Sequence, residues 1–100
     1  MQNHYQLSGQ IIRPPQLTRS PAGISHLRFV LEHQSEQIEA GLTRRSYVRI
    51  TVVLSGELGE QWANELNVGN EVQVTGFLNR IEDRNGIGKL VLHGQQLVKI

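Results

Sequence analysis

The side chains of this sequence that could do chemistry are basic and aromatic. Three arginines surround one tyrosine in a short segment, with Arg44 and Arg45 before Tyr47 and Arg49 after it. Cations that follow a phosphate backbone, together with a ring on which a base can stack, are what binding to a single-stranded nucleic acid requires. Tyr47 could equally be a cross-strand packing residue on an exposed sheet, so both interpretations stay open at this point.

Further cations fall where the predicted elements would bring them toward the same ligand. Arg19 lies on an early loop, Arg84 in the turn before the last predicted strand, and Lys89 at the start of that strand. One ring with six or seven cations predicts modest, sequence-tolerant affinity. The predicted DNA-binding residues are therefore Tyr47, Arg49, Arg84, Lys89, Arg44, Arg45 and Arg19.

Catalytic and metal-binding patterns are missing from the sequence. The four histidines are scattered without the spacing of metal ligands, and the absence of cysteine excludes disulfides and thiolate sites. Glu82 and Asp83 are adjacent on a turn, so they cannot flank a substrate as acid and base. Gly86-Ile87-Gly88 lacks the third glycine and the helix of a phosphate-binding loop. We expect a protein that is not an enzyme and needs no metal or other cofactor.

Length and composition predict one small domain, 1–100, because 100 residues with 38% hydrophobic content close only one core. No apolar run is long enough to cross a membrane, and the first residues lack the layout of a secretory signal. We therefore expect a cytoplasmic protein. Residues 50–79 hold four acids and no Lys or Arg, whereas the rest holds all ten bases and five acids. This asymmetry indicates either an anionic ligand on one side or two solvated surfaces.

The apolar pattern predicts five strands and one helix between turn-forming residues. The expected strands span 5–13, 26–34, 46–54, 71–81 and 89–100. A loop is expected from Pro14-Pro15 through residue 23, and a second, polar loop over 36–43. Gly76 predicts a bulge or sharp bend in the fourth strand, and Asn85-Gly86 predicts a turn within a hairpin loop over 82–88.

Periodicity assigns faces to two of these elements. In the third predicted strand the even positions from 48 to 54 are apolar, whereas Tyr47 and Arg49 face the other way. Leu58, Trp62 and Leu66 are four residues apart and predict one apolar stripe on a helix over 57–66. We expect Trp62 to pack in the core rather than to stack on a ligand.

The order strand, strand, strand, helix, strand, strand is typical of the all-β OB-fold. This fold is a five-stranded Greek-key barrel, here with one short helix between strands 3 and 4. A five-stranded SH3-like barrel is the alternative, but it does not account for the helix. The OB-fold binds ligands on strands two and three, flanked by the loops that join strands one to two and four to five. The predicted cations lie in these regions.

Several short strings of this sequence resemble the bacterial primosomal replication protein N family. The most specific is Phe29-Val30-Leu31-Glu32-His33 followed shortly by Glu39-Ala40-Gly41. The other matching strings are Leu7-Ser8-Gly9, Ser20-Pro21-Ala22-Gly23-Ile24, Val68-Gly69, Val74-Thr75-Gly76-Phe77 and Val91-Leu92-His93. The resemblance covers essentially the whole chain without an evident gap.

The resemblance implies a homodimer of OB domains related to single-stranded DNA-binding proteins. It implies single-stranded DNA as ligand, the restart helicase (primosomal protein N′) and primosomal protein I as partners in the replication-restart primosome, and no cofactor. Tyr47 stands where the family has a stacking tryptophan, and Arg84 and Lys89 keep the expected positive charge. The sequence departs from the family at Thr18, Gln34 and Glu82, where cations are expected, and at Leu42, where an aromatic residue is expected.

Two hypotheses of different classes follow. The first is a single-stranded-DNA-binding accessory protein that bridges the restart helicase to the next primosomal protein. The alternative is mainly a protein–protein adaptor with vestigial DNA binding, which the missing cations favour. A first strand with apolar residues at Leu7, Ile11 and Ile12 could pair with its symmetry mate, which would give the dimer.

Overall fold

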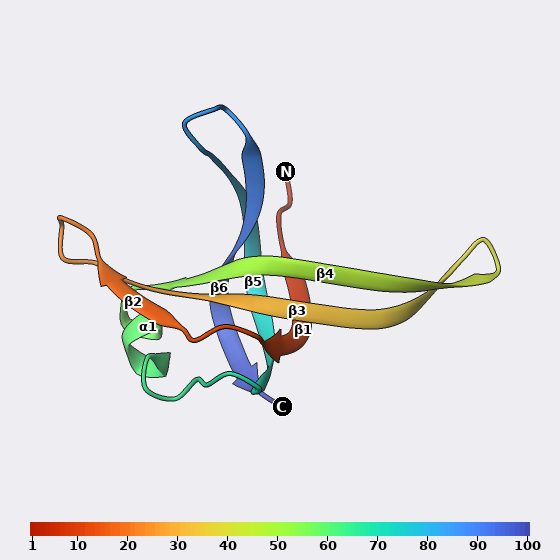
Figure 1. Cartoon of the computed structure of the whole chain (residues 1–100), viewed down its shortest axis with the longest axis horizontal. Helices are drawn as coiled ribbons and strands as arrows, with labels where there is room; N and C mark the ends of the chain where they lie inside the picture. Colours follow the sequence, from red (N-terminus) through yellow and green to blue (C-terminus); the bar gives the residue numbers. More distant parts are fainter.

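Six strands and one short helix make up the structure, a computed structural model that describes residues 1–100 (Figure 1). In chain order they are β1 (Tyr5–Ile11), β2 (Gln16–Arg19), β3 (Ser25–Glu39), β4 (Leu42–Ser55), α1 (Glu57–Trp62), β5 (Glu71–Glu82) and β6 (Gly88–Lys99). The five predicted strands and the helix occur in the predicted order. The strand β2 is an addition that the sequence pattern did not predict.

The strands pair in the order β1-β5-β6-β4-β3-β2, and a second pairing between β1 and β3 closes the first five into a barrel. Only β4 and β6 run parallel; the other neighbours are antiparallel. The short helix joins β4 to β5, as the OB-fold requires and an SH3-like barrel does not. The predicted OB-fold is therefore confirmed, with β2 as an edge strand outside the closed ring.

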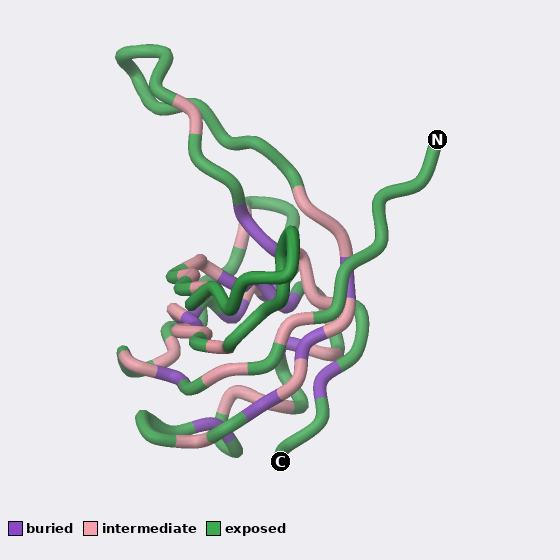
Figure 2. The backbone as a smooth tube through the Cα atoms, turned by 90° about the vertical axis from the view of Figure 1, so that its right-hand side faces the viewer, coloured by how far each residue is buried: buried purple, intermediate pink, exposed green.

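Alternate residues of the barrel strands fill one hydrophobic core. The predicted inward positions of β3 are Leu27, Phe29 and Leu31, and all three are buried. The other core residues come from every remaining barrel strand and from the segment after the helix: Ile11, Val52, Leu54, Leu66, Val72, Val74, Leu92 and Leu97. Figure 2 shows the buried segments gathered in the body of the barrel. The β5–β6 hairpin, which projects at the top of this view, is mostly exposed.

Gly76 lies at the predicted irregularity of the fourth barrel strand. The β5–β6 register shifts between Thr75, which pairs with Gln96, and Gly76, which pairs with Gly94. A Cβ atom at Gly76 would overlap the backbone carbonyl of His93. The bend therefore depends on a residue without a side chain, because the two backbones approach too closely for any other.

The predicted polar loop over 36–43 is wrong. β3 and β4 stay paired as far as Glu39 and Leu42, and the turn between them consists only of Ala40 and Gly41. Both turn residues have positive φ, 52° and 76°, as the tightest hairpin turns require. The paired strands project from the barrel as an arm (Figure 1). Both faces of the arm meet solvent, so it has no core face that would give an alternating apolar pattern.

Two further boundaries differ from the predicted ones. Residues 16–19 form β2 rather than a loop; all four are exposed, so no burial pattern marks the strand. The helix ends at Trp62 rather than at residue 66, because the amides of Glu65 and Leu66 both bond to the carbonyl of Trp62 and form a turn. Leu66 is nevertheless buried, and Trp62 packs half-buried against the core as predicted.

Gly76→Ala should destabilise the barrel, since the added methyl group forces β5 away from β6. We expect a loss of about 1–3 kcal/mol in the free energy of unfolding, measured by chemical denaturation. Gln96→Ala, an exposed change on the neighbouring strand, is the control and should stay within about 0.5 kcal/mol of the original protein. Equal effects of the two substitutions would show that the close approach at Gly76 is not required.

Candidate nucleic-acid interface

Tyr47 lies on the solvent side of β4, with 51% of its surface exposed. Arg45 and Arg49 project from the same face of β4, because side chains alternate along a strand. The ring of Phe77 is already used in packing, since it stacks on His93 with ring centroids 4.9 Å apart and planes inclined by 11°. Tyr47 is therefore the accessible ring among the arginines, and it is not sealed inside the barrel.

Glu32 of β3 holds Tyr47 and Arg49 in one cluster. The Tyr47 hydroxyl donates to Oε2 of Glu32 at 2.9 Å, and Nη2 of Arg49 donates to the same oxygen at 2.8 Å. Nη2 also donates to the Tyr47 hydroxyl at 2.8 Å, and the guanidinium carbon lies 5.9 Å from the centre of the ring. We call these three residues the Glu32 cluster. Its geometry fixes the ring and the cation relative to each other.

These contacts keep both charged members of the cluster ionised. The hydrogen bond from Tyr47, followed by that from Arg49, holds the pKa of the Glu32 carboxyl below its ordinary value. The hydrogen bond to Glu32 raises the pKa of Arg49. At neutral pH the cluster therefore contains a negative carboxylate and a positive guanidinium, which neutralise each other.

Arg49 also lines a groove of about 490 Å³. Three residues around it are cationic, namely Arg13, Arg49 and Lys89. Its apolar lining comes from Val30, Val48, Ile50 and Leu90. Lys89 reaches the groove because β6 runs parallel to β4, with Val91 opposite Thr51. The groove thus combines positive charge with apolar surface, which suits a strand of phosphates and bases.

Arg13 belongs to this groove although it is absent from the predicted set. It follows the end of β1 and directly precedes Pro14-Pro15. A signal was available, because the OB-fold places the connection after its first strand beside the ligand face. A neighbouring cavity of about 220 Å³ is lined by Arg13 and Arg28, and shares Arg13, Val30 and Thr51 with the groove. The cationic surface therefore continues toward Arg28.

Three of the predicted binding residues lie away from the groove. Arg19 on β2 forms a salt bridge of 3.3 Å with Glu60 of the helix, and Arg44 on the arm forms one of 3.5 Å with Glu39. Arg45 lies on the arm without a salt bridge. β2 and the tip of the arm are at opposite ends of the long axis (Figure 1). The structure therefore places Arg19 away from Tyr47 and holds Arg44 in a salt bridge, whereas Arg45 lies beside Tyr47 on the same face of β4.

Arg84 lies in the turn of the β5–β6 hairpin, and Lys89 lies near the base of the same turn, paired in register with Ile81. The predicted hairpin turn is confirmed: the amides of Asn85 and Ile87 donate to Oδ1 of Asp83 at 2.8 and 3.0 Å. Glu82, the negative residue on this hairpin, forms a salt bridge of 3.3 Å with Arg80. Arg84 itself forms no salt bridge, so its charge is available to a ligand.

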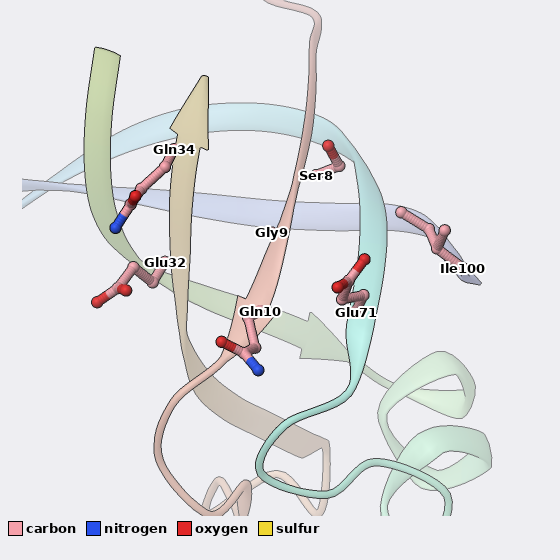
Figure 3. A pocket seen from close by; sticks show the side chains of 7 residues that line it. All are labelled: Ser8, Gly9, Gln10, Glu32, Gln34, Glu71 and Ile100. Carbon is pink, nitrogen blue, oxygen red and sulfur yellow. The ribbon is translucent and has the colours of Figure 1, made fainter. Parts of the chain in front are cut away.

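A second polar cavity, of about 360 Å³, has the opposite charge. Glu32 and Gln34 line it from β3 and Glu71 lines it from β5, with Ile100 as its only apolar residue (Figure 3). No Lys or Arg lines this cavity and two carboxylates do, so it attracts phosphate less than the groove does. No group of three or more His, Asp or Glu side chains is placed to hold a metal ion. The structure also contains no helix with the length and apolar character needed to cross a membrane.

An OB barrel with an exposed ring beside a cationic groove is typical of OB-fold proteins that bind single-stranded nucleic acids. A family model described as "Another single-strand binding protein family" matches residues 3–96. Replication restart protein PriB of Vibrio parahaemolyticus is 45% identical over all 100 residues of both chains, and that of Vibrio vulnificus is 42% identical over the same length. The protein from Photorhabdus laumondii is 44% identical over 95% of this chain and 90% of its own. The chain belongs to the PriB family of replication restart proteins.

Solved structures show the same fold. The PriB structure from Ralstonia solanacearum superposes with a TM-score of 0.80 at 20% identity, and the match covers 100% of both chains. The single-stranded DNA-binding protein from Thermus aquaticus gives 0.84 at 22% identity, covering 99% of this chain and 50% of that one. The predicted resemblance to primosomal replication protein N is thereby confirmed. The names of these relatives describe replication and DNA binding, and none of them denotes an enzyme.

Tyr47→Phe should raise the pKa of Glu32 part of the way to its ordinary value, because the largest cause of the lowering is the Tyr47 hydroxyl while Arg49 remains. A carboxyl with a lowered folded-state pKa stabilises the fold above its unfolded pKa. This contribution is lost as the pH falls through the folded-state pKa. The titration midpoint of the Glu32 side chain, followed by NMR, tests this. An unchanged midpoint in Tyr47→Phe would contradict it.

Proposed function

We propose that this protein binds single-stranded DNA in replication restart. On this proposal Arg13, Arg49 and Lys89 contact the phosphates along the groove, while Tyr47 stacks on a base. The observation that carries the proposal is the exposed ring beside a groove lined by three cations. The description of the matching family and the name of the relatives support the ligand and the process. Stacking on Tyr47 would be sequence-tolerant, because every base has a π-face.

The other predicted residues would contribute where a longer strand leaves the groove. Arg45 on the arm and Arg84 in the β5–β6 turn form no salt bridge and can each meet a phosphate. Arg19 and Arg44 would first have to leave their carboxylate partners. The proposed order of importance is therefore the groove residues first and these flanking arginines second.

The proposed role in the primosome is to bridge the DNA to other proteins. The partners are the restart helicase (primosomal protein N′) and primosomal protein I, which the family resemblance implies. A DNA-bound barrel would raise the effective concentration of the next factor at the fork without any new chemistry. The name of the relatives, replication restart protein, supports this role.

A homodimer is part of the proposal, and the edge of β1 supports it. β1 pairs with β5 along Tyr5 to Gln10 but with β3 only at Gln10 and Ile11, so most of one edge has no partner strand. An apolar cavity of about 220 Å³ lies at this strand, lined by Tyr5, Gln6, Leu7, Val48, Ile50, Leu78, Leu90 and Leu92. A second copy could pair with the edge and cover the cavity. Ile11 and Ile12 contribute less than the sequence suggested, because Ile11 is fully buried and Ile12 is half-buried.

The adaptor alternative also has an observation in its favour. Salt bridges occupy four of the ten basic side chains, namely Arg19, Arg44, Arg49 and Arg80. A surface that neutralises its own cations attracts phosphate less strongly. On this alternative the barrel holds protein partners, and its DNA affinity has no role in restart.

The DNA-binding proposal predicts a salt-dependent affinity that Tyr47 supports. The two groove cations that form no salt bridge, Arg13 and Lys89, should give a slope of about −1.4 for log affinity against log salt, at about 0.7 for each cation on a single strand. Tyr47→Ala should weaken binding by about 1–3 kcal/mol through lost stacking, whereas Tyr47→Phe should keep most of the affinity. Fluorescence anisotropy with a labelled oligo(dT) measures both quantities.

The charge control for this measurement uses two lysines of the same strand. Lys89→Ala should lower the slope, but Lys99→Ala, at the other end of β6, should leave it unchanged. A flat salt response in a protein that still stimulates the restart helicase would favour the adaptor instead.

The dimer proposal predicts that Tyr5→Glu gives a monomer, because it places a charge in the apolar interface. Analytical ultracentrifugation of the original protein should give twice the mass of one chain. Ile24→Glu is the matched control, since Ile24 and Tyr5 are both 49% exposed but Ile24 lies in the β2–β3 turn. A monomeric original protein would rule the dimer out.

A further inference from the structure

Glu32 accepts the hydrogen bonds that Tyr47 and Arg49 of the proposed site would otherwise donate to a phosphate. Its Oε2 atom accepts hydrogen bonds from the Tyr47 hydroxyl and from Nη2 of Arg49, at 2.9 and 2.8 Å. The side chain of Glu32 is only 21% exposed, whereas that of Arg49 is 50% exposed. Glu32 is therefore the less exposed partner of the salt bridge, while half of the Arg49 side-chain surface stays open to solvent.

The position of Glu32 follows from the strand register. Glu32 pairs directly with Arg49 across β3 and β4, and Tyr47 pairs with the next residue on the same face, Gln34. Carboxylate and phosphate oxygens both accept charge-assisted hydrogen bonds from guanidinium groups. A carboxylate placed here resembles a phosphate that the free protein already holds.

We propose that Glu32 is an intramolecular counter-ion that competes with DNA phosphate for Arg49 and the Tyr47 hydroxyl, and so sets the affinity of the site. The proposal rests on the DNA-binding function proposed above. Binding of a strand then breaks the Glu32–Arg49 salt bridge, and the guanidinium exchanges one anion for another. The ring of Tyr47 stays available for stacking throughout, because its hydroxyl alone contacts Glu32.

Neutralising Glu32 should strengthen DNA binding and change its salt dependence. In Glu32→Gln, Arg49 no longer has an anionic partner, and the amide oxygen can still accept from Tyr47. We expect the affinity for labelled oligo(dT) to rise about fivefold at low salt, the equivalent of losing one exposed ion pair. The slope of log affinity against log salt should become steeper by about 0.7, because the site gains one net positive charge.

Glu65→Gln is the matched control, because it removes the same formal charge from an exposed residue that forms no salt bridge. It should leave both the affinity and the slope close to those of the original protein. Equal gains in the two variants would mean that only net charge matters, which overturns the competition. Unchanged or weaker binding by Glu32→Gln would also overturn it, because Glu32 would then position the ring and the cation for DNA.

A double-mutant cycle locates the effect in Arg49. With Arg49→Gln already present, Glu32→Gln should give no further gain, and a persisting gain would overturn the proposal. Binding by Glu32→Gln in conditions where the original protein does not bind would support it. If the original protein binds oligo(dT) through Tyr47 but Glu32→Gln brings no gain, only this inference fails. If neither protein binds at low salt, the DNA-binding function fails as well.

Discussion

The alternation of side chains along β4 is the constraint on which both the core and the candidate site depend. Val52 and Leu54 fill the barrel, whereas Tyr47 and Arg49 stand on the opposite face of the same strand. A slip of one residue against β3 would turn every side chain over, so that a guanidinium would enter the core. Burial of the apolar face therefore fixes the exposure of the ring, and the core stabilises the site without contacting a ligand.

Closure of the barrel brings the remaining cations to this face from distant parts of the chain. Arg13 follows β1, which pairs with both β5 and β3 and so completes the ring of strands. Lys89 arrives on β6, which lies parallel to β4. The bend at Gly76 allows β5 and β6 to curve together, because their backbones can then approach closely. The groove is thus a product of topology, and no single segment of sequence contains it.

The sequence predicts the parts of the fold that have one buried face and one solvent-exposed face. The inward positions of β3 and the Gly76 bend are apparent because burial and close backbone approach restrict the residues allowed there. The arm and β2 are exposed on both sides, so their residues carry no such restriction and their sequence pattern predicts loops. This error also hid the Glu32 cluster. Only a turn placed at Ala40 and Gly41 gives the register that sets Glu32 opposite Arg49.

The charges of this protein act locally, since its net charge of +1 attracts a polyanion only weakly. Salt bridges neutralise Arg19, Arg44, Arg49 and Arg80 in the free protein, which leaves Arg13 and Lys89 as the free cations of the groove, with Arg45 free on the arm and Arg84 free in the β5–β6 turn. One tyrosine and a few free cations give one barrel modest affinity. Two barrels in a symmetric dimer would offer two such grooves to one strand, and binding at the first would raise the effective concentration at the second. Modest affinity at each groove would then correspond to fast dissociation of the strand, because dissociation rates vary more than association rates among related sites.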